Sequence, residues 1–264
     1  MFKDEIIKRF IRGNPNVISY FLEENFLNYF SKEEIQILFE NLNSSPIIKE
    51  DPKLIFLLLN KFNDIDVSEI KWLDNLKIIK KLNLTANKLT YLKGIEYFTQ
   101  LEKLNLSENQ LVEIKGLRPL INLMKLILNK NHIKEIKGIE NLINLRELYL
   151  WDNKIEEIKG LENLRKLEKL SLGGNRIKEI KGLESLTNLT SLDLSYNQIT
   201  RINRLNNLQM LQRLYLHSNE LKEMKGIENL SNLQELWIAN NKLPDKILNN
   251  LKSSKIKFHL HETN

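Results

Sequence analysis

Residues 145–166 read LRELYLWDNKIEEIKGLENLRK, and residues 167–188 read LEKLSLGGNRIKEIKGLESLTN. Both segments place leucine at the first, fourth and sixth positions, asparagine at the ninth and glycine at the sixteenth. A fixed period of this kind indicates a repeat architecture and not an ordinary globular domain. Eight such 22-residue repeats follow one another, numbered one to eight, and they open at Ile79, Leu101, Leu123, Leu145, Leu167, Leu189, Leu211 and Leu233.

The spacing within one repeat predicts a short strand, a turn and a return segment. Leucines at positions four and six alternate with variable residues, which puts the leucines on one face of a strand. The asparagine comes where the chain leaves the strand, so its amide can pair with buried backbone groups of adjacent turns. The return is too short for a strand and a long helix, which favours 3₁₀ or irregular turns. Stacked repeats then merge their apolar positions into one core beneath a parallel sheet.

The pattern L-x-x-L-x-L-x-x-N-x-L resembles the leucine-rich repeat family over residues 68–264, specifically its 22-residue class. That class includes the regulatory subunits of protein phosphatase one and the bacterial internalins. The resemblance implies an α/β solenoid, a horseshoe with a concave parallel β-sheet and short 3₁₀ or irregular turns on the convex side. It also implies a non-enzymatic interaction module or scaffold that binds another protein.

Residues 1–67 differ from the repeats and are predicted to form a helical N-terminal cap. They carry eight Lys or Arg and eleven Asp or Glu, whereas the whole chain has a net charge of +6. Apolar residues recur there at helical spacing, and Ser31 with Glu34 makes a capping box. A solenoid needs a cap because its terminal core would otherwise face water. The alternative is a separate module that recruits a second partner.

The repeats are predicted to span residues 68–254, as a degenerate half repeat followed by the eight full repeats. In the half repeat Trp72 stands where the other repeats have glycine. Residues 255–264 are predicted to add a C-terminal capping strand, because Phe258 continues the leucine position of repeat eight and Thr263 then replaces the asparagine.

Composition and missing motifs exclude several classes of function. The chain has no cysteine, so disulfides, thiolate nucleophiles and cysteine-bound metals are ruled out. It contains no phosphate-binding loop, dinucleotide fingerprint, serine elbow or zinc-protease motif. The longest apolar run, residues 54–59, is far shorter than the roughly 20 residues of a membrane helix, and the first residues lack a signal-peptide pattern. We therefore expect a cytoplasmic, monomeric protein that is not an enzyme and holds no cofactor or metal.

Function is expected on the concave face, at positions three, five, seven and eight of each repeat. Large rings gather there from repeat four onward, on both sides of a low point formed by Ser171, Gly173 and Gly174. Exposed Trp and Tyr residues are typical anchors of protein interfaces. The sequence thus predicts an aromatic partner-binding patch made of Tyr149, Trp151, Tyr196, Tyr215, His217, Trp237 and His259.

Three other interpretations remain open. The rings could simply support one another across the sheet, which accounts for Tyr215 beside Trp237 but not for Trp151. Two near-terminal histidines, at positions 259 and 261, could suggest a metal, but two ligands are few. The alternative function is a nucleic-acid or anionic-surface binder that uses the basic first repeats. That reading is disfavoured because the rings lie where charge cancels. Its lysines would be Lys81, Lys103 and Lys125.

Overall fold

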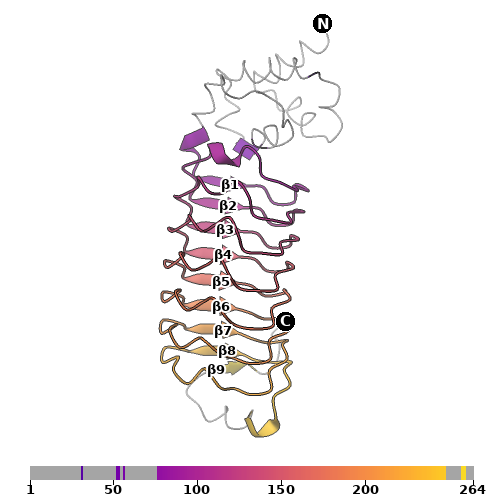
Figure 1. Cartoon of the computed structure of the whole chain (residues 1–264), viewed down its shortest axis with the longest axis vertical. Helices are drawn as coiled ribbons and strands as arrows, with labels where there is room; N and C mark the ends of the chain where they lie inside the picture. Colours follow the sequence, from indigo (N-terminus) through magenta and orange to yellow (C-terminus); the bar gives the residue numbers. More distant parts are fainter. Residues whose placement is uncertain (1–30, 32–51, 54–55, 57–75, 248–256, 260–264) are drawn as a thin grey trace.

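The repeats form one stack of parallel strands (Figure 1). The computed structural model describes residues 31, 52–53, 56, 76–247 and 257–259. Within these residues, nine strands lie side by side in sequence order in a single sheet. The strands are β1 (Lys81–Asn83), β2 (Lys103–Asn105), β3 (Lys125–Ile127), β4 (Glu147–Tyr149), β5 (Lys169–Ser171), β6 (Ser191–Asp193), β7 (Arg213–Tyr215), β8 (Glu235–Trp237) and β9 (Lys257–His259).

Each strand pairs with the next at equivalent positions of the repeat. Leu126 lies opposite Leu148, and Leu148 lies opposite Leu170. One turn of the solenoid is therefore one 22-residue repeat, which confirms the predicted parallel-strand solenoid. Because the register never shifts, side chains at the same position of every repeat form straight rows across the sheet.

The core is the column of leucine and isoleucine side chains behind the sheet. The middle residue of β4, Leu148, and the residue after the strand, Leu150, both have 0% of their surface exposed. Ile155, Ile158 and Leu161 of the same repeat close the core from the return segment and are also buried. Neither a strand of three residues nor its return could bury these side chains alone, so the fold depends on contacts between neighbouring repeats.

A ladder of buried asparagines joins the repeats behind the strands. Asn153 donates hydrogen bonds from Nδ2 to the carbonyl oxygens of Leu128 (3.0 Å) and Leu150 (3.1 Å). Its Oδ1 accepts the backbone N–H of Ile133 at 3.0 Å. Each such side chain therefore satisfies buried backbone groups of its own repeat and of the preceding one. The same arrangement recurs at Asn109, Asn131, Asn175, Asn197 and Asn219.

The return segments are short turns, as the sequence predicts, with a 3₁₀ helix at Ile95–Tyr97 (η4). Glycine is required in the returns whose backbone comes closest to the preceding repeat, whereas the return of repeat six has Arg204 at the glycine position. Gly138 has a φ of +90°, and a Cβ there would lie 2.2 Å from the carbonyl oxygen of Ile114. A side chain at this position would collide with the backbone, so the I-K-G block of the sequence reflects a steric requirement.

The predicted N-terminal helical cap lies almost entirely outside the described residues and stays a prediction. Of the residues described in this segment, Phe56 is fully buried. Its ring contacts Phe98 of repeat one edge to face, with centroids 6.3 Å apart. The apolar core therefore continues from the first repeat to a residue of the segment ahead of it.

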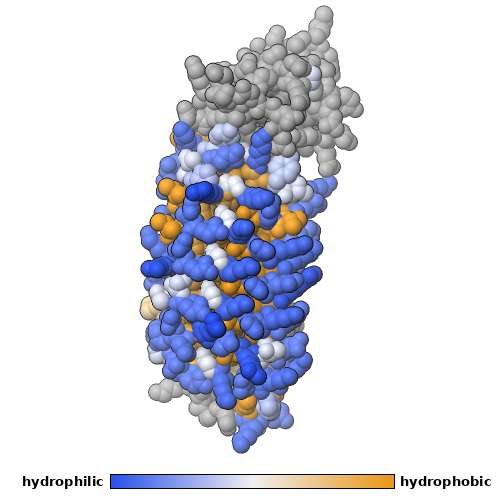
Figure 2. Space-filling view, viewed as in Figure 1, coloured by the Kyte–Doolittle hydropathy of each residue, from blue (hydrophilic) through white to orange (hydrophobic). Residues whose placement is uncertain are grey.

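The surface of the stack is mainly hydrophilic. Figure 2 shows polar side chains in columns along the long axis, with hydrophobic atoms visible between them. These columns follow from the constant register, which stacks equivalent residues above one another. Among the described residues, none belongs to a helix with the length and apolar character needed to span a bilayer.

Candidate functional site

Side chains at positions three, five and seven of each repeat point away from the core and make up one side of the sheet, called here the sheet face. In β3 through β8 the first and third residues are half-buried and the middle one is buried. The sheet face is therefore a partly desolvated surface whose chemistry changes from repeat to repeat.

Three of the seven predicted residues form a continuous stack at the C-terminal end of the sheet face. The rings of Tyr215 and Trp237 stack with centroids 4.3 Å apart and an interplanar angle of 17°. Trp237 and His259 stack at 4.1 Å and 4°. The three residues occupy position five of consecutive strands in register, which is why their rings overlap. We call Tyr215, Trp237 and His259 the ring ladder.

Tyr196 and His217 form a second ring contact at positions eight and seven. Their centroids are 5.2 Å apart with an interplanar angle of 85°. Tyr196 has a φ of +51°, one of a row of left-handed residues at position eight, and its N–H donates to the carbonyl oxygen of His217 at 2.9 Å. Nearly half of the tyrosine surface, 47%, remains exposed.

Trp151 lies over Gly173 of the next repeat and does not border an empty low point. A Cβ built on Gly173 would be 2.8 Å from Cδ1 of the indole, 2.9 Å from Oγ of Ser195 and 3.0 Å from Oδ1 of Asp193. Gly173 is itself buried. Three side chains thus converge on the space that the glycine leaves, so the low point expected at Gly173 is occupied.

Asp193 anchors a polar strip between the two groups of rings. Its Oδ2 accepts a hydrogen bond from the hydroxyl of Ser171 at 2.8 Å. Its Oδ1 accepts from the backbone N–H of Ser195 at 3.0 Å and from the hydroxyl of that residue at 2.6 Å. The structure therefore separates the seven predicted residues into Tyr149 with Trp151 on one side and the other five on the far side of this strip.

Glu147 is a functional candidate that sequence reasoning missed. Its Oε2 lies 2.8 Å from Nζ of Lys125 and its Oε1 lies 3.0 Å from Nζ of Lys169. The hydroxyl of Tyr149 also donates to Oε2 at 3.0 Å, and Nζ of Lys125 lies 5.0 Å from the centroid of that ring. The signal was present in the sequence, because Glu147 interrupts a run of lysines at position three.

These contacts shift two titratable groups. Partial burial alone would raise the pKa of Glu147, but the hydrogen bonds from Lys125, Lys169 and Tyr149 together outweigh it and lower the pKa to about 2. Burial, followed by the hydrogen bond to Glu147, raises the pKa of Tyr149 to about 12. At neutral pH the carboxylate is therefore ionised and the tyrosine neutral. Lys125 is consequently paired and does not extend the basic surface that the sequence suggested.

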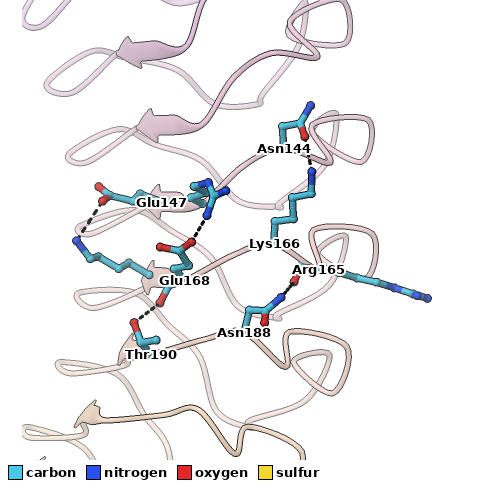
Figure 3. A network of polar contacts seen from close by, with 9 residues as sticks. Asn144, Glu147, Arg165, Lys166, Glu168, Asn188 and Thr190 are labelled. Atoms are coloured by element: carbon cyan, nitrogen blue, oxygen red, sulfur yellow. Dashed lines mark hydrogen bonds and ion pairs between the residues drawn. The ribbon is translucent and has the colours of Figure 1, made fainter.

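Further polar contacts join repeats three to six beside the strands (Figure 3). The guanidinium of Arg146 is bonded to Glu168 of the next repeat. The carbonyl oxygen of Glu168 accepts the hydroxyl of Thr190 at 3.0 Å, and Lys166 donates to Oδ1 of Asn144 at 2.8 Å. These exposed contacts repeat from turn to turn and read as links within the scaffold.

The described residues assemble no metal centre. The histidine at position 261 lies outside the described residues, so the His259 pair of the sequence is not placed. Within the residues that the structure describes, no group of three or more His, Asp or Glu side chains could hold a metal ion.

Parallel three-residue strands, an asparagine ladder and short glycine-containing returns define a solenoid of 22-residue repeats with one open sheet. Comparison with known proteins agrees with this class. A model of paired leucine-rich repeats matches residues 121–163 and 165–207, and a single leucine-rich repeat model matches residues 232–254. These matches support the leucine-rich repeat family, and the parallel-strand solenoid fits a leucine-rich repeat horseshoe.

Several solved bacterial structures are similar to the chain. An internalin (InlF) from Listeria monocytogenes is 32% identical with a TM-score of 0.57, covering 75% of this chain and 65% of that one. Internalin C2 from the same species is 28% identical with a TM-score of 0.64, covering 75% and 88%. A leucine-rich repeat protein from Leptospira interrogans is 33% identical with a TM-score of 0.65, covering 70% and 50%.

The chain thus spans less than two thirds of InlF and half of the Leptospira protein. No curated protein matches it by sequence. The cytoplasmic location and the monomeric state predicted from the sequence stay predictions.

Proposed function

We propose that the chain is a non-enzymatic interaction module that binds a partner protein on its concave sheet face. The partner would contact the aromatic patch of Tyr149, Trp151, Tyr196, Tyr215, His217, Trp237 and His259. The observation that carries this proposal is the ring ladder, in which three half-buried rings stack across three consecutive strands.

The ring ladder has the physical properties of an interface anchor. Stacking fixes the planes of Tyr215, Trp237 and His259 before any partner arrives, so binding costs little side-chain entropy. The three rings lie on consecutive strands of one sheet, which positions them rigidly. Large aromatic side chains held in this way carry much of the binding energy at protein interfaces.

Stacking of the rings on one another explains part of this arrangement, but it does not account for all of it. Cross-strand ring pairs contribute about 0.2 to 1 kcal/mol each, which accounts for stacking within the ladder. Within the described part of the sheet face, Trp151 has no such ring partner. Its indole instead covers a glycine, which leaves a large apolar side chain half-buried with no stabilising stack.

The family supports the general part of the proposal. Leucine-rich repeat proteins serve as scaffolds for protein partners, and two of the similar structures are internalins. Partner identity is carried by the side chains at positions three, five, seven and eight, which differ between repeats, and not by the shared architecture.

The test is affinity capture of partners from the native organism, followed by affinity measurement with the captured protein. Trp151→Ala and Trp237→Ala should each weaken binding about thirtyfold while leaving the melting temperature nearly unchanged, because neither substitution opens a core cavity. Ile121→Ala with Ile143→Ala is the matched control. Both isoleucines are 54% exposed on return segments away from the sheet face. Equal capture by wild type and by both tryptophan variants would refute the patch.

A further inference from the structure

A second surface on the sheet face lies at the opposite end from the ring ladder. A hollow of about 330 Å³ opens over β1, β2 and β3. Its polar lining comes from Lys81, Asn83, Lys103, Asn105 and Lys125. Position three supplies the lysines and position five the asparagines, so the two residue types form two short parallel rows.

The asparagines of the hollow present hydrogen-bond donors outward. Oδ1 of Asn83 accepts the backbone N–H of Thr85 at 3.1 Å, and Oδ1 of Asn105 accepts that of Ser107 at 3.0 Å. A backbone N–H can only donate, so the atom facing it must be the amide oxygen. The Nδ2 group of each asparagine is thereby turned away from the turn. Among the contacts of the described residues, neither Nδ2 donates to a protein acceptor.

The two lysines of β1 and β2 make no ion pair of their own among the described residues. Neither Lys81 nor Lys103 has an ion pair within the part of the chain that the structure describes, whereas Lys125 is bound to Glu147 at 2.8 Å. The flanking Glu102 is itself bound to Lys80 at 2.9 Å. That hydrogen bond, with the charges of Lys80, Lys81 and Lys103, lowers the pKa of Glu102, so this carboxylate is ionised and already engaged.

The hollow therefore offers two ammonium groups and two amide donors. The Oδ1 atoms of its two asparagines already accept hydrogen bonds from the turns. Equivalent residues on adjacent strands are about 4.8 Å apart, so each lysine and asparagine on one strand is repeated on the next. The lysine and the asparagine of one strand can together bind the two oxygens of one anion. The lysine and the asparagine of the other strand can bind a second anion in the same way.

We propose that this hollow binds carboxylate side chains from an acidic segment of the partner protein. The inference rests on the proposed function, since it assigns a second contact to the same partner. An acidic segment at β1 and β2 and an apolar segment at β7 to β9 would place the partner along the sheet, across the strands.

A carboxylate-bearing peptide fits the hollow better than a nucleic acid. Binding of single strands relies on rings that stack with bases between basic residues. The residues lining the hollow include no aromatic ring. The unpaired positive charge also ends at Lys103, because the next lysine in the row is neutralised by Glu147.

The test measures binding of labelled probes to the full chain by fluorescence anisotropy at low salt. The probes are a hexaglutamate peptide and a single-stranded DNA of the same formal charge. Lys81→Gln with Lys103→Gln removes the ammonium groups. Asn83→Asp with Asn105→Asp keeps the oxygen that the turn requires and replaces the outward donor by a carboxylate oxygen. Lys115→Gln with Lys137→Gln is the control, because it changes net charge equally at exposed positions outside the sheet face.

We expect each sheet-face double variant to weaken peptide binding at least about tenfold, with the control nearly unchanged. An equal loss in the control would mean that net charge alone acts, and the proposal would fall. Tighter binding of the DNA, lost in the same variants, would overturn it in favour of a nucleic-acid site. Trp237→Ala should leave peptide binding unchanged, so failure of the aromatic patch and failure of the hollow give different results.

Discussion

The indole of Trp151 fills the space above Gly173 of the following repeat, where a methyl group would lie 2.8 Å from ring atom Cδ1. The position of the ring therefore depends on the absence of a side chain 22 residues further along the chain. The atoms in conflict belong to side chains and not to the backbone, and Gly173 does not have a left-handed φ.

Gly173→Ala is accordingly expected to displace the Trp151 ring without breaking the strand. We expect a change in tryptophan fluorescence, weaker partner binding and a loss of stability of about 1 kcal/mol from local overpacking. Trp151→Ala introduced together with Gly173→Ala should relieve the overcrowding, so the two stability losses should be less than additive in denaturant unfolding. Strict additivity would contradict the contact.

Asn153→Ala should destabilise the solenoid strongly. The substitution leaves the Ile133 N–H and the carbonyl oxygens of Leu128 and Leu150 without this partner inside the stack. The two carbonyl oxygens keep hydrogen bonds from Asn131 and Asn175, so the Ile133 N–H is the group left unpaired, at a cost of about 1 to 3 kcal/mol. Asn163→Ala is the control, because that side chain makes one exposed hydrogen bond of 3.4 Å. Similar unfolding midpoints for the two variants in urea would argue against the ladder.

Leu148→Ala should lower the free energy of unfolding by about 2 to 5 kcal/mol, because the side chain is fully buried and its removal leaves a cavity. Val112→Ala provides the comparison, since that residue is 49% exposed and its truncation should change stability little. The two midpoints can be compared in one set of urea unfolding curves. A wild-type midpoint for Leu148→Ala would mean that the repeat register is wrong.

Glu147 should stabilise the fold in a pH-dependent way. Its folded pKa of about 2 lies below the ordinary value of 4.5, so its contribution is full above about pH 4.5 and is lost as the pH falls towards 2. Glu147→Gln should therefore lower the melting temperature most near neutral pH, and the difference from wild type should shrink on acidification. Glu157→Gln removes the same charge from an exposed pair and should show little effect at any pH. A constant difference for Glu147→Gln between pH 7 and 3 would refute this role.

Phe56→Ala should destabilise the first repeats by about 3 to 5 kcal/mol, because its ring is fully buried against Phe98. Ile78→Ala serves as the control at a nearby residue that is 58% exposed. Hydrogen exchange should locate the increased opening in the first repeats, since each repeat is stabilised mainly by its neighbours.

Deletion of residues 1–67 should have a larger effect of the same kind. A truncated chain that is soluble and equally stable would instead support an independent module.

Much of the fold could be predicted because the same sequence pattern, which is weak evidence in one copy, recurs eight times. A single LxxLxL segment is ambiguous, but eight copies in register fix strand positions, strand order and the inward side of each strand together. The asparagine at position nine was expected to bridge neighbouring turns, and Asn153 does so. The predicted cap was different in kind, because residues 1–67 have no internal repeat to reinforce their helical spacing.

The sequence by itself determined the period, the core residues and the row in which every outward side chain lies. Those properties depend on spacing along the chain, which the strict 22-residue register converts directly into position. Only the tertiary structure decided that Trp151 covers Gly173. It also decided that Glu147 forms ion pairs with both Lys125 and Lys169, and that Lys81 and Lys103 form none among the described residues. These contacts depend on the side-chain conformations chosen between repeats, because neighbouring rows lie close enough for each long side chain to reach more than one partner.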